Sequence, residues 1–171
     1  ETRESIVGFQ TELENSDQVG VSLRDSYERL HEPFSPGGHL SIPVGGYAFR
    51  DAQLSYALGP QRRFAGRVVL TVGGYFDGDI TSLDLRRGRV EVIQRLSIEP
   101  SFSFNWINLP AGSLRTDLAR ARVTYTVSPR MFFSGLLQYN ATNDTLGANL
   151  RLRWEYSPGS ELFVVYTEEQ S

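Results

Sequence analysis

Apolar and polar side chains alternate along this chain in runs of ten or more residues, and this pattern restricts the fold more than any other feature. The run from Leu96 to Trp106 places Phe102 and Phe104 on one face and Glu99, with Ser and Asn side chains, on the other. The run from Leu146 to Tyr156 repeats the pattern with arginines on its polar face. A period of two residues is that of a β-strand with two chemically different faces, and no segment shows a convincing helical period. The sequence therefore predicts an all-β protein.

Ten strands are expected in the single domain 1–171, most of them longer than the usual five or six residues. The alternating segments are 4–14, 19–30, 47–58, 64–74, 80–90, 95–107, 114–127, 131–140, 145–156 and 161–168. Their lengths match the roughly 9–11 residues with which a tilted strand crosses a bilayer. Short turns alternate with longer connections, of which the long surface loop 31–46 is the largest. This arrangement is typical of an antiparallel up-and-down transmembrane β-barrel.

Aromatic residues support the same prediction, because they flank both ends of the predicted strands. Two aromatic girdles are expected where a barrel meets the two interfaces of a membrane. The predicted girdle residues are Tyr27, Tyr56, Trp106, Tyr125, Tyr139, Trp154 and Tyr156. The charged residues predicted to face the lumen are Glu12, Arg24, Glu99, Arg120, Arg122, Arg151, Arg153 and Glu155. Asp25 is the exception, since it falls on the apolar face unless it lies above the apolar band or its strand contains a bulge.

Composition excludes several classes of function. The chain has no Cys, so it has no disulfide framework and no thiol nucleophile. Its net charge of −3 provides no basic footprint for nucleic acid, and no apolar run approaches the roughly 18 residues of a membrane-spanning helix. The expected partner is the lipid bilayer, and no cofactor or metal is predicted.

Several segments resemble a known family. They are Ser26 to Phe34, the Ile42-Pro43, Gly46-Tyr47 and Phe49 stretch, Leu136 to Asn140, Asn149 to Tyr156, and Pro158 to Tyr166. Together they resemble the C-terminal β-barrel domain of large bacterial outer-membrane proteins that often carry an N-terminal carbohydrate-binding family-nine-like module. The resemblance implies an outer-membrane location in a Gram-negative bacterium and a further strand after Glu168 that ends in an aromatic residue. It implies no activity, because the barrel domain has no assigned catalytic motif.

The direction of the strands predicts that both ends of the chain lie at the end of the long loop. Complete outer-membrane barrels have an even number of strands and usually place both termini in the periplasm, at the end of the short turns. The simplest interpretation is a part of a larger barrel that lacks at least one strand before Glu1 and one after Ser171, strands that other chains or missing segments would supply. A closed ten-stranded barrel with surface termini is the alternative.

The predicted function is a pore, or a membrane anchor or scaffold, without a catalytic motif. One alternative is a surface hydrolase that uses His31 or His39, the only histidines, although their spacing matches no metal motif. The other alternative is a soluble β-domain that binds a ligand on its polar face. An arginine-rich lumen would favour anions or sugar acids, although salt bridges that stiffen the wall are the more favoured role of these charges.

Overall fold

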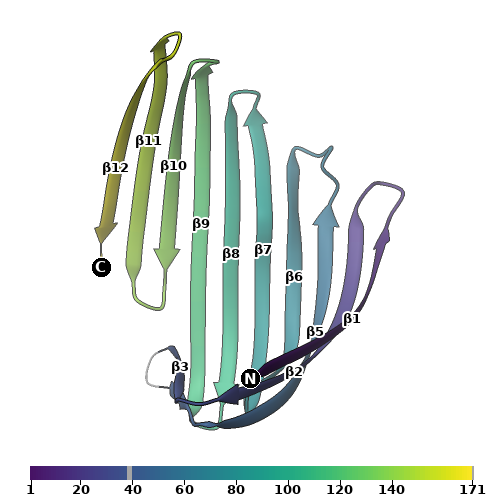
Figure 1. The fold of residues 1–171 in the computed structure, drawn as a ribbon. Helices are drawn as coiled ribbons and strands as arrows, with labels where there is room; N and C mark the ends of the chain where they lie inside the picture. The colour runs from purple at the N-terminus through teal and green to yellow at the C-terminus, as the bar shows by residue number, and fades with distance from the viewer. Residues whose placement is uncertain (38–39, 171) are drawn as a thin grey trace.

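The computed structural model describes residues 1–37 and 40–170, which form an all-β antiparallel fold (Figure 1). The twelve strands are β1 (Thr2–Glu12), β2 (Gln18–Leu30), β3 (Phe34–Gly37), β4 (Leu40–Ile42), β5 (Gly45–Leu58), β6 (Phe64–Tyr75), β7 (Gly78–Ile93), β8 (Leu96–Leu109), β9 (Gly112–Ser128), β10 (Met131–Asn140), β11 (Thr145–Ser157) and β12 (Ser160–Gln170). Each of the ten segments predicted from alternation forms one long strand. The described residues contain no helix that is long and apolar enough to span a membrane.

Ten of the strands form one sheet in the order β1-β2-β5-β6-β7-β8-β9-β10-β11-β12, and every neighbouring pair is antiparallel. Consecutive long strands therefore pair with each other, as the up-and-down prediction requires. The predicted difference between the two ends is smaller than expected. The turns 76–77 and 110–111, at the end of the long loop, are as tight as the turn 129–130 at the opposite end.

The sheet does not close into a barrel. Among the described residues β1 pairs only with β2, and β12 pairs only with β11, so both strands are free edges (Figure 1). The all-β antiparallel sheet is thus confirmed, whereas barrel closure is not observed. Chain direction is compatible with closure, because β1 runs toward the short-turn end and β12 runs away from it. Two such edges are antiparallel to each other.

Part of the loop 31–46 is structured. Phe34 pairs with Ile42 to form the small β3–β4 sheet, and Ile42 is only 1% exposed. Ile42 packs with Phe76, Ile107 and Leu109 into the hydrophobic cluster of the molecule. The loop therefore packs against one end of the large sheet.

The two faces of the large sheet differ sharply. We call the face that carries Arg24, Asp51 and Arg120 the polar face, and the face that carries Val21 and Leu54 the apolar face. Register and strand alternation assign every sheet residue to one of the two. Many large hydrophobic side chains of the apolar face are exposed, with Phe9 at 71% and Leu54 at 50%. No second layer of described residues covers them (Figure 1).

Candidate functional site

The predicted charged residues share the polar face. Register places all eight there: Glu12, Arg24, Glu99, Arg120, Arg122, Arg151, Arg153 and Glu155. The structure brings Glu99, Arg120 and Arg122 together on β8 and β9, where Glu99 is the direct cross-strand partner of Arg122. Arg24 lies on β2 and belongs to a different set of contacts. The polar face therefore carries separate groups of charges rather than one ladder, and two of these groups line hollows.

The first group lies on the N-terminal strands. The Nε atom of Arg24 donates to Asp51 Oδ2 at 2.7 Å, and Arg24 also reaches Glu4 Oε1 at 3.4 Å. Asp51 is buried, and its Oδ1 atom has no hydrogen-bond partner among the described residues. This group lines a hollow of about 690 Å³ that also includes Asp84, which accepts a hydrogen bond from Arg86 at 3.0 Å. Here acids and bases neutralise one another.

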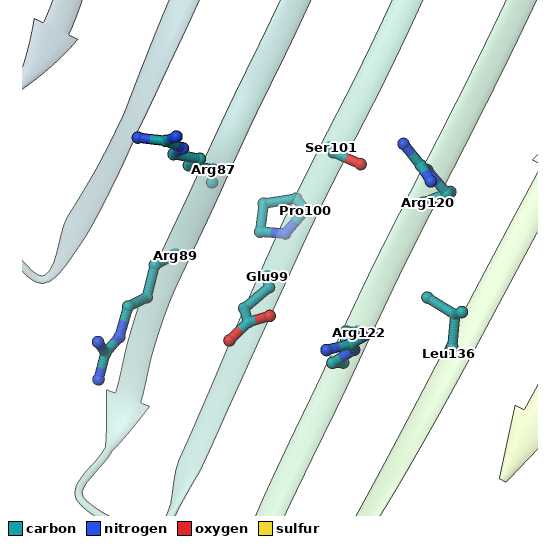
Figure 2. A pocket seen from close by; sticks show the side chains of 9 residues that line it. Arg87, Arg89, Glu99, Pro100, Ser101, Arg120, Arg122 and Leu136 are labelled. Carbon is teal, nitrogen blue, oxygen red and sulfur yellow. The ribbon is translucent and has the colours of Figure 1, made fainter.

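The second group surrounds β8 and is rich in arginine. Figure 2 shows Arg87 and Arg89 on β7 and Arg120 and Arg122 on β9, on either side of Glu99. These five residues line a hollow of about 420 Å³, together with Gly88, Pro100, Ser101 and Leu136. We call this set the arginine patch. It holds four guanidinium groups and one carboxylate.

A β-bulge in β7 positions two of these arginines. Arg86 and Arg89 pair with Arg67 and Ala65 of β6, so β7 has two residues where β6 has one. Arg87 occupies the extra position with a φ of 54°, a left-handed conformation that is uncommon for a residue with a side chain. Bulges of this kind redirect side chains. In a regular strand, Arg87 and Arg89 would share one face and Arg86 would take the other, so at least one arginine would point to the apolar face.

Arg153 belongs to neither group. Its guanidinium forms an ion pair with Glu161 on β12. It also lies over the rings of Phe132 and Phe163, at 5.8 and 5.9 Å from their centroids. These contacts fix Arg153 to the neighbouring strands, so its role is structural.

A fully buried carboxylate fastens two turns together at the short-turn end. Asp17, with 0% exposure, is the last residue of the turn between β1 and β2. It accepts hydrogen bonds from Tyr56 Oη at 2.6 Å, from the Gly59 amide at 2.8 Å, from Arg62 at 2.9 Å and from Asn15 at 2.9 Å. The Tyr56 hydroxyl, followed by the Gly59 amide, holds the pKa of Asp17 below its ordinary value of 3.8, against the opposing effect of burial. Charged Asp17 therefore stabilises the folded state.

Replacing Asp17 by asparagine is expected to lower the thermal unfolding midpoint, because an amide cannot accept all four of these hydrogen bonds. The lowered pKa also predicts a pH dependence. The folded state gains stability from this group above pH 3.8 and loses it as the pH falls toward the folded-state pKa. Circular dichroism melts between pH 3 and 6 measure both effects. The matched control is Asp77→Asn in an exposed turn. Equal melting curves for the two variants would contradict the assigned role of Asp17.

The predicted girdle residues lie on the apolar face. Tyr27, Tyr56, Trp106, Tyr125, Tyr139, Trp154 and Tyr156 are all placed there by register and alternation. Tyr56 donates to Asp17 at one end of the sheet, and Tyr139 donates to Asp144 at 3.1 Å at the other. Each of these tyrosines thus joins an apolar strand face to a polar turn.

Asp25 stays on the apolar face without a bulge. The register between β2 and β5 is continuous, and Asp25 lies directly opposite Arg50. Arg50 Nε donates to Asp25 Oδ2 at 2.6 Å. The neighbouring positions across the ladder include Asp79 and Asn108, so a polar row borders the apolar residues on this side. Asp25 therefore lies beyond the apolar band, which was one of its two expected explanations.

The apolar residues form a band that runs obliquely across the strands. On β1 the middle residue of the band is Phe9, and on β12 it is Val164. Following the cross-strand partners from Phe9 leads to Asp117 on β9, and following them from Val164 leads to Tyr125 on the same strand. These two positions are eight residues apart, over nine steps between strands. With about 3.3 Å per residue and 4.8 Å per strand, the strands tilt by about 30° from the normal of the band.

The histidines do not form a catalytic or metal site that the structure describes. His31 is exposed between β2 and β3, and His39 lies outside the described residues. Within the described ranges, no group of three His, Cys, Asp or Glu side chains is arranged to hold a metal ion.

Alternation alone missed three features of the candidate site: the arginines Arg86, Arg87 and Arg89, the buried Asp51, and Asp17. The Arg-Arg-Gly-Arg segment 86–89 is the one available signal, because continuous alternation there would place a charge on the apolar face. Comparison of the chain with protein-family models, with curated proteins and with solved structures finds no match.

Proposed function

We propose that the large sheet is the wall of a transmembrane β-barrel of a bacterial outer membrane, and that it acts as a pore or as a membrane anchor. The observation that carries this proposal is the uncovered apolar face, arranged as an oblique band. Soluble monomers rarely leave apolar patches larger than a few hundred Å² exposed. The hydrocarbon chains of a lipid bilayer can cover an apolar face that extends over ten neighbouring strands.

The tilt of the band supports the bilayer over a protein partner. A membrane imposes a level apolar layer on strands that cross it at an angle, so the apolar residues must shift along each successive strand. The shift across this sheet gives about 30°, close to the tilts of roughly 35–45° in membrane barrels. Aromatic residues at both borders of the band also agree with two interfaces.

The polar face supports a water-filled interior. Arg24, Arg120 and Arg122 lie there with Asp51 and Glu99. On the apolar face, the cross-strand row that starts at Phe9 is apolar through Phe104 and reaches a charged residue only at Asp117 on β9. Charge on the lipid side of such a wall costs about 2–4 kcal/mol at the midplane, while charge on the interior side is hydrated.

The two free edges complete the proposal. Unpaired backbone groups are not tolerated in the hydrocarbon layer. β1 and β12 must therefore pair with each other or with further strands when the sheet is in a membrane. Their antiparallel directions permit direct pairing or an even number of added strands.

We expect the chain to fold into a compact β-rich form only in detergent or lipid. The compact form should migrate faster on a gel without heating and slower after heating, and circular dichroism should show a β spectrum in both amphiphiles. Refolding in plain buffer serves as the comparison. A monodisperse β-protein in buffer alone would overturn the proposal, since the apolar face would then need no lipid.

A further inference from the structure

We propose that the arginine patch is a binding site for small oxyanions, that is, for solutes that carry a carboxylate, sulfate or phosphate group. The inference extends the proposed pore by naming the class of solute. The site itself rests on residues of the polar face and requires only that the sheet be folded.

Charge that is not neutralised is the first argument. Arg24, Arg62 and Arg153 each have an acidic partner within 4 Å, and so do Arg86 and Arg89. Arg87, Arg120 and Arg122, by contrast, have no such partner among the described residues. Three guanidinium groups therefore line one hollow with Glu99 as the single carboxylate. The hollow carries an excess of positive charge.

The geometry of the donors is the second argument. Arg120 and Arg122 are two residues apart on β9, so their side chains leave the same face of the sheet. Figure 2 shows them on one side of β8, with Arg87 on the other side and Ser101 between them. A guanidinium offers a planar pair of donors that fits two oxygens of a carboxylate, sulfate or phosphate. The Ser101 hydroxyl provides a further donor.

The bulge in β7 is the third argument. A left-handed conformation is strained at a residue with a side chain. Arg87 adopts this conformation and thereby lines the patch. Gly88 makes the bulge possible, because a Cβ atom there would lie 2.1 Å from the carbonyl oxygen of Pro100. Strain of this kind is characteristic of functional positions.

Three other acidic residues of the polar face lie outside the patch. Asp51, Asp84 and Glu4 belong to the hollow on the N-terminal strands, where Arg24 and Arg86 pair with them. The patch is therefore separate from the neutralised group. Its lining contains one carboxylate, Glu99, while Glu91 is engaged by Arg89.

The test uses the double variant Arg120→Gln/Arg122→Gln in the refolded, detergent-solubilised protein. The matched control is Arg95→Gln/Arg130→Gln, which removes two positive charges at the short-turn end. Calorimetric titration at low salt would measure binding of inorganic sulfate and of glucuronate, with glucose as the neutral probe. We expect the parent and the control to bind both anions, the patch variant to bind them about tenfold more weakly, and glucose to bind to none.

Conductance in planar bilayers separates this inference from the proposed function. Anion preference, measured as a reversal potential in a KCl gradient, should fall in the patch variant and persist in the control. If both variants conduct with the same anion preference and bind anions with the same affinity, the anion site is overturned while the proposed pore is supported. Anion binding that only the patch variant loses, in a chain that never inserts into bilayers, would uphold the site and overturn the membrane function.

Discussion

Replacing Leu54 by arginine is expected to destabilise the protein folded in lipid vesicles by about 2–4 kcal/mol, which is the cost of a charge at the middle of the lipid-facing side of a barrel. Leu54 lies opposite Val21 and Leu70 on the apolar face, within the apolar band. Leu54 is 50% exposed. Loss of packing alone would therefore cost little. Urea unfolding in vesicles, followed by circular dichroism, measures the change.

Gln53→Arg is the matched control, because Gln53 is the neighbouring residue and faces the opposite side. It lines the hollow of the polar face, with Asp51 two residues away. The free energy of unfolding of the Gln53→Arg variant should lie within about 0.5 kcal/mol of that of the parent. If water rather than lipid covered the apolar face, Leu54→Arg would be a surface substitution and would also change the free energy of unfolding by only about 0.5 kcal/mol. Similar small effects for both variants would therefore contradict a bilayer against the apolar face.

Replacing Gly88 by alanine is expected to cost about 2–3 kcal/mol of folding free energy, as overpacking does at a site that cannot move. The added Cβ would lie 2.1 Å from the carbonyl oxygen and 3.0 Å from Cγ of Pro100. Both atoms belong to the neighbouring strand β8, so relief of the clash requires β7 and β8 to separate. The same variant should weaken sulfate binding, because the bulge positions Arg87.

Gly147→Ala tests whether the effect belongs to the bulge. Gly147 lies in a regular part of β11, and the nearest atom to an added Cβ is the carbonyl oxygen of Gln138 at 3.9 Å. Alanine there should be neutral or slightly stabilising, since glycine weakens a strand. Urea unfolding of the two variants side by side decides the point. Equal stability would mean that β7 tolerates a side chain at position 88 and that the bulge is not fixed by Gly88.

The sequence predicted the strands well because its signal is local. Alternation over ten or more residues depends only on which face each side chain must take, and a slip by one residue would invert both faces. The predicted strand 95–107 and the observed β8 (Leu96–Leu109) differ by two residues at most. The same parity placed Arg120 on one face and Tyr125 on the other.

Features that depend on a break in alternation were not predicted. The bulge at Arg87 adds one residue to β7. It becomes visible only when the residues of β7 are paired with those of β6 and β8. Asp17 reads as an ordinary turn residue until Tyr56 and Gly59, about forty residues later, are seen to surround its carboxylate.

The sequence by itself determined the strand order and the two-faced character of the sheet, since both follow from side-chain parity and short connections. Only the tertiary structure decided that β3 and β4 pack against one end of the sheet, and that β1 and β12 are free edges. It also decided that the arginines divide into a neutralised group and a patch with excess charge. The physical reason is that pairing across strands depends on register, and register brings together residues such as Glu99 and Arg122 that no local pattern connects.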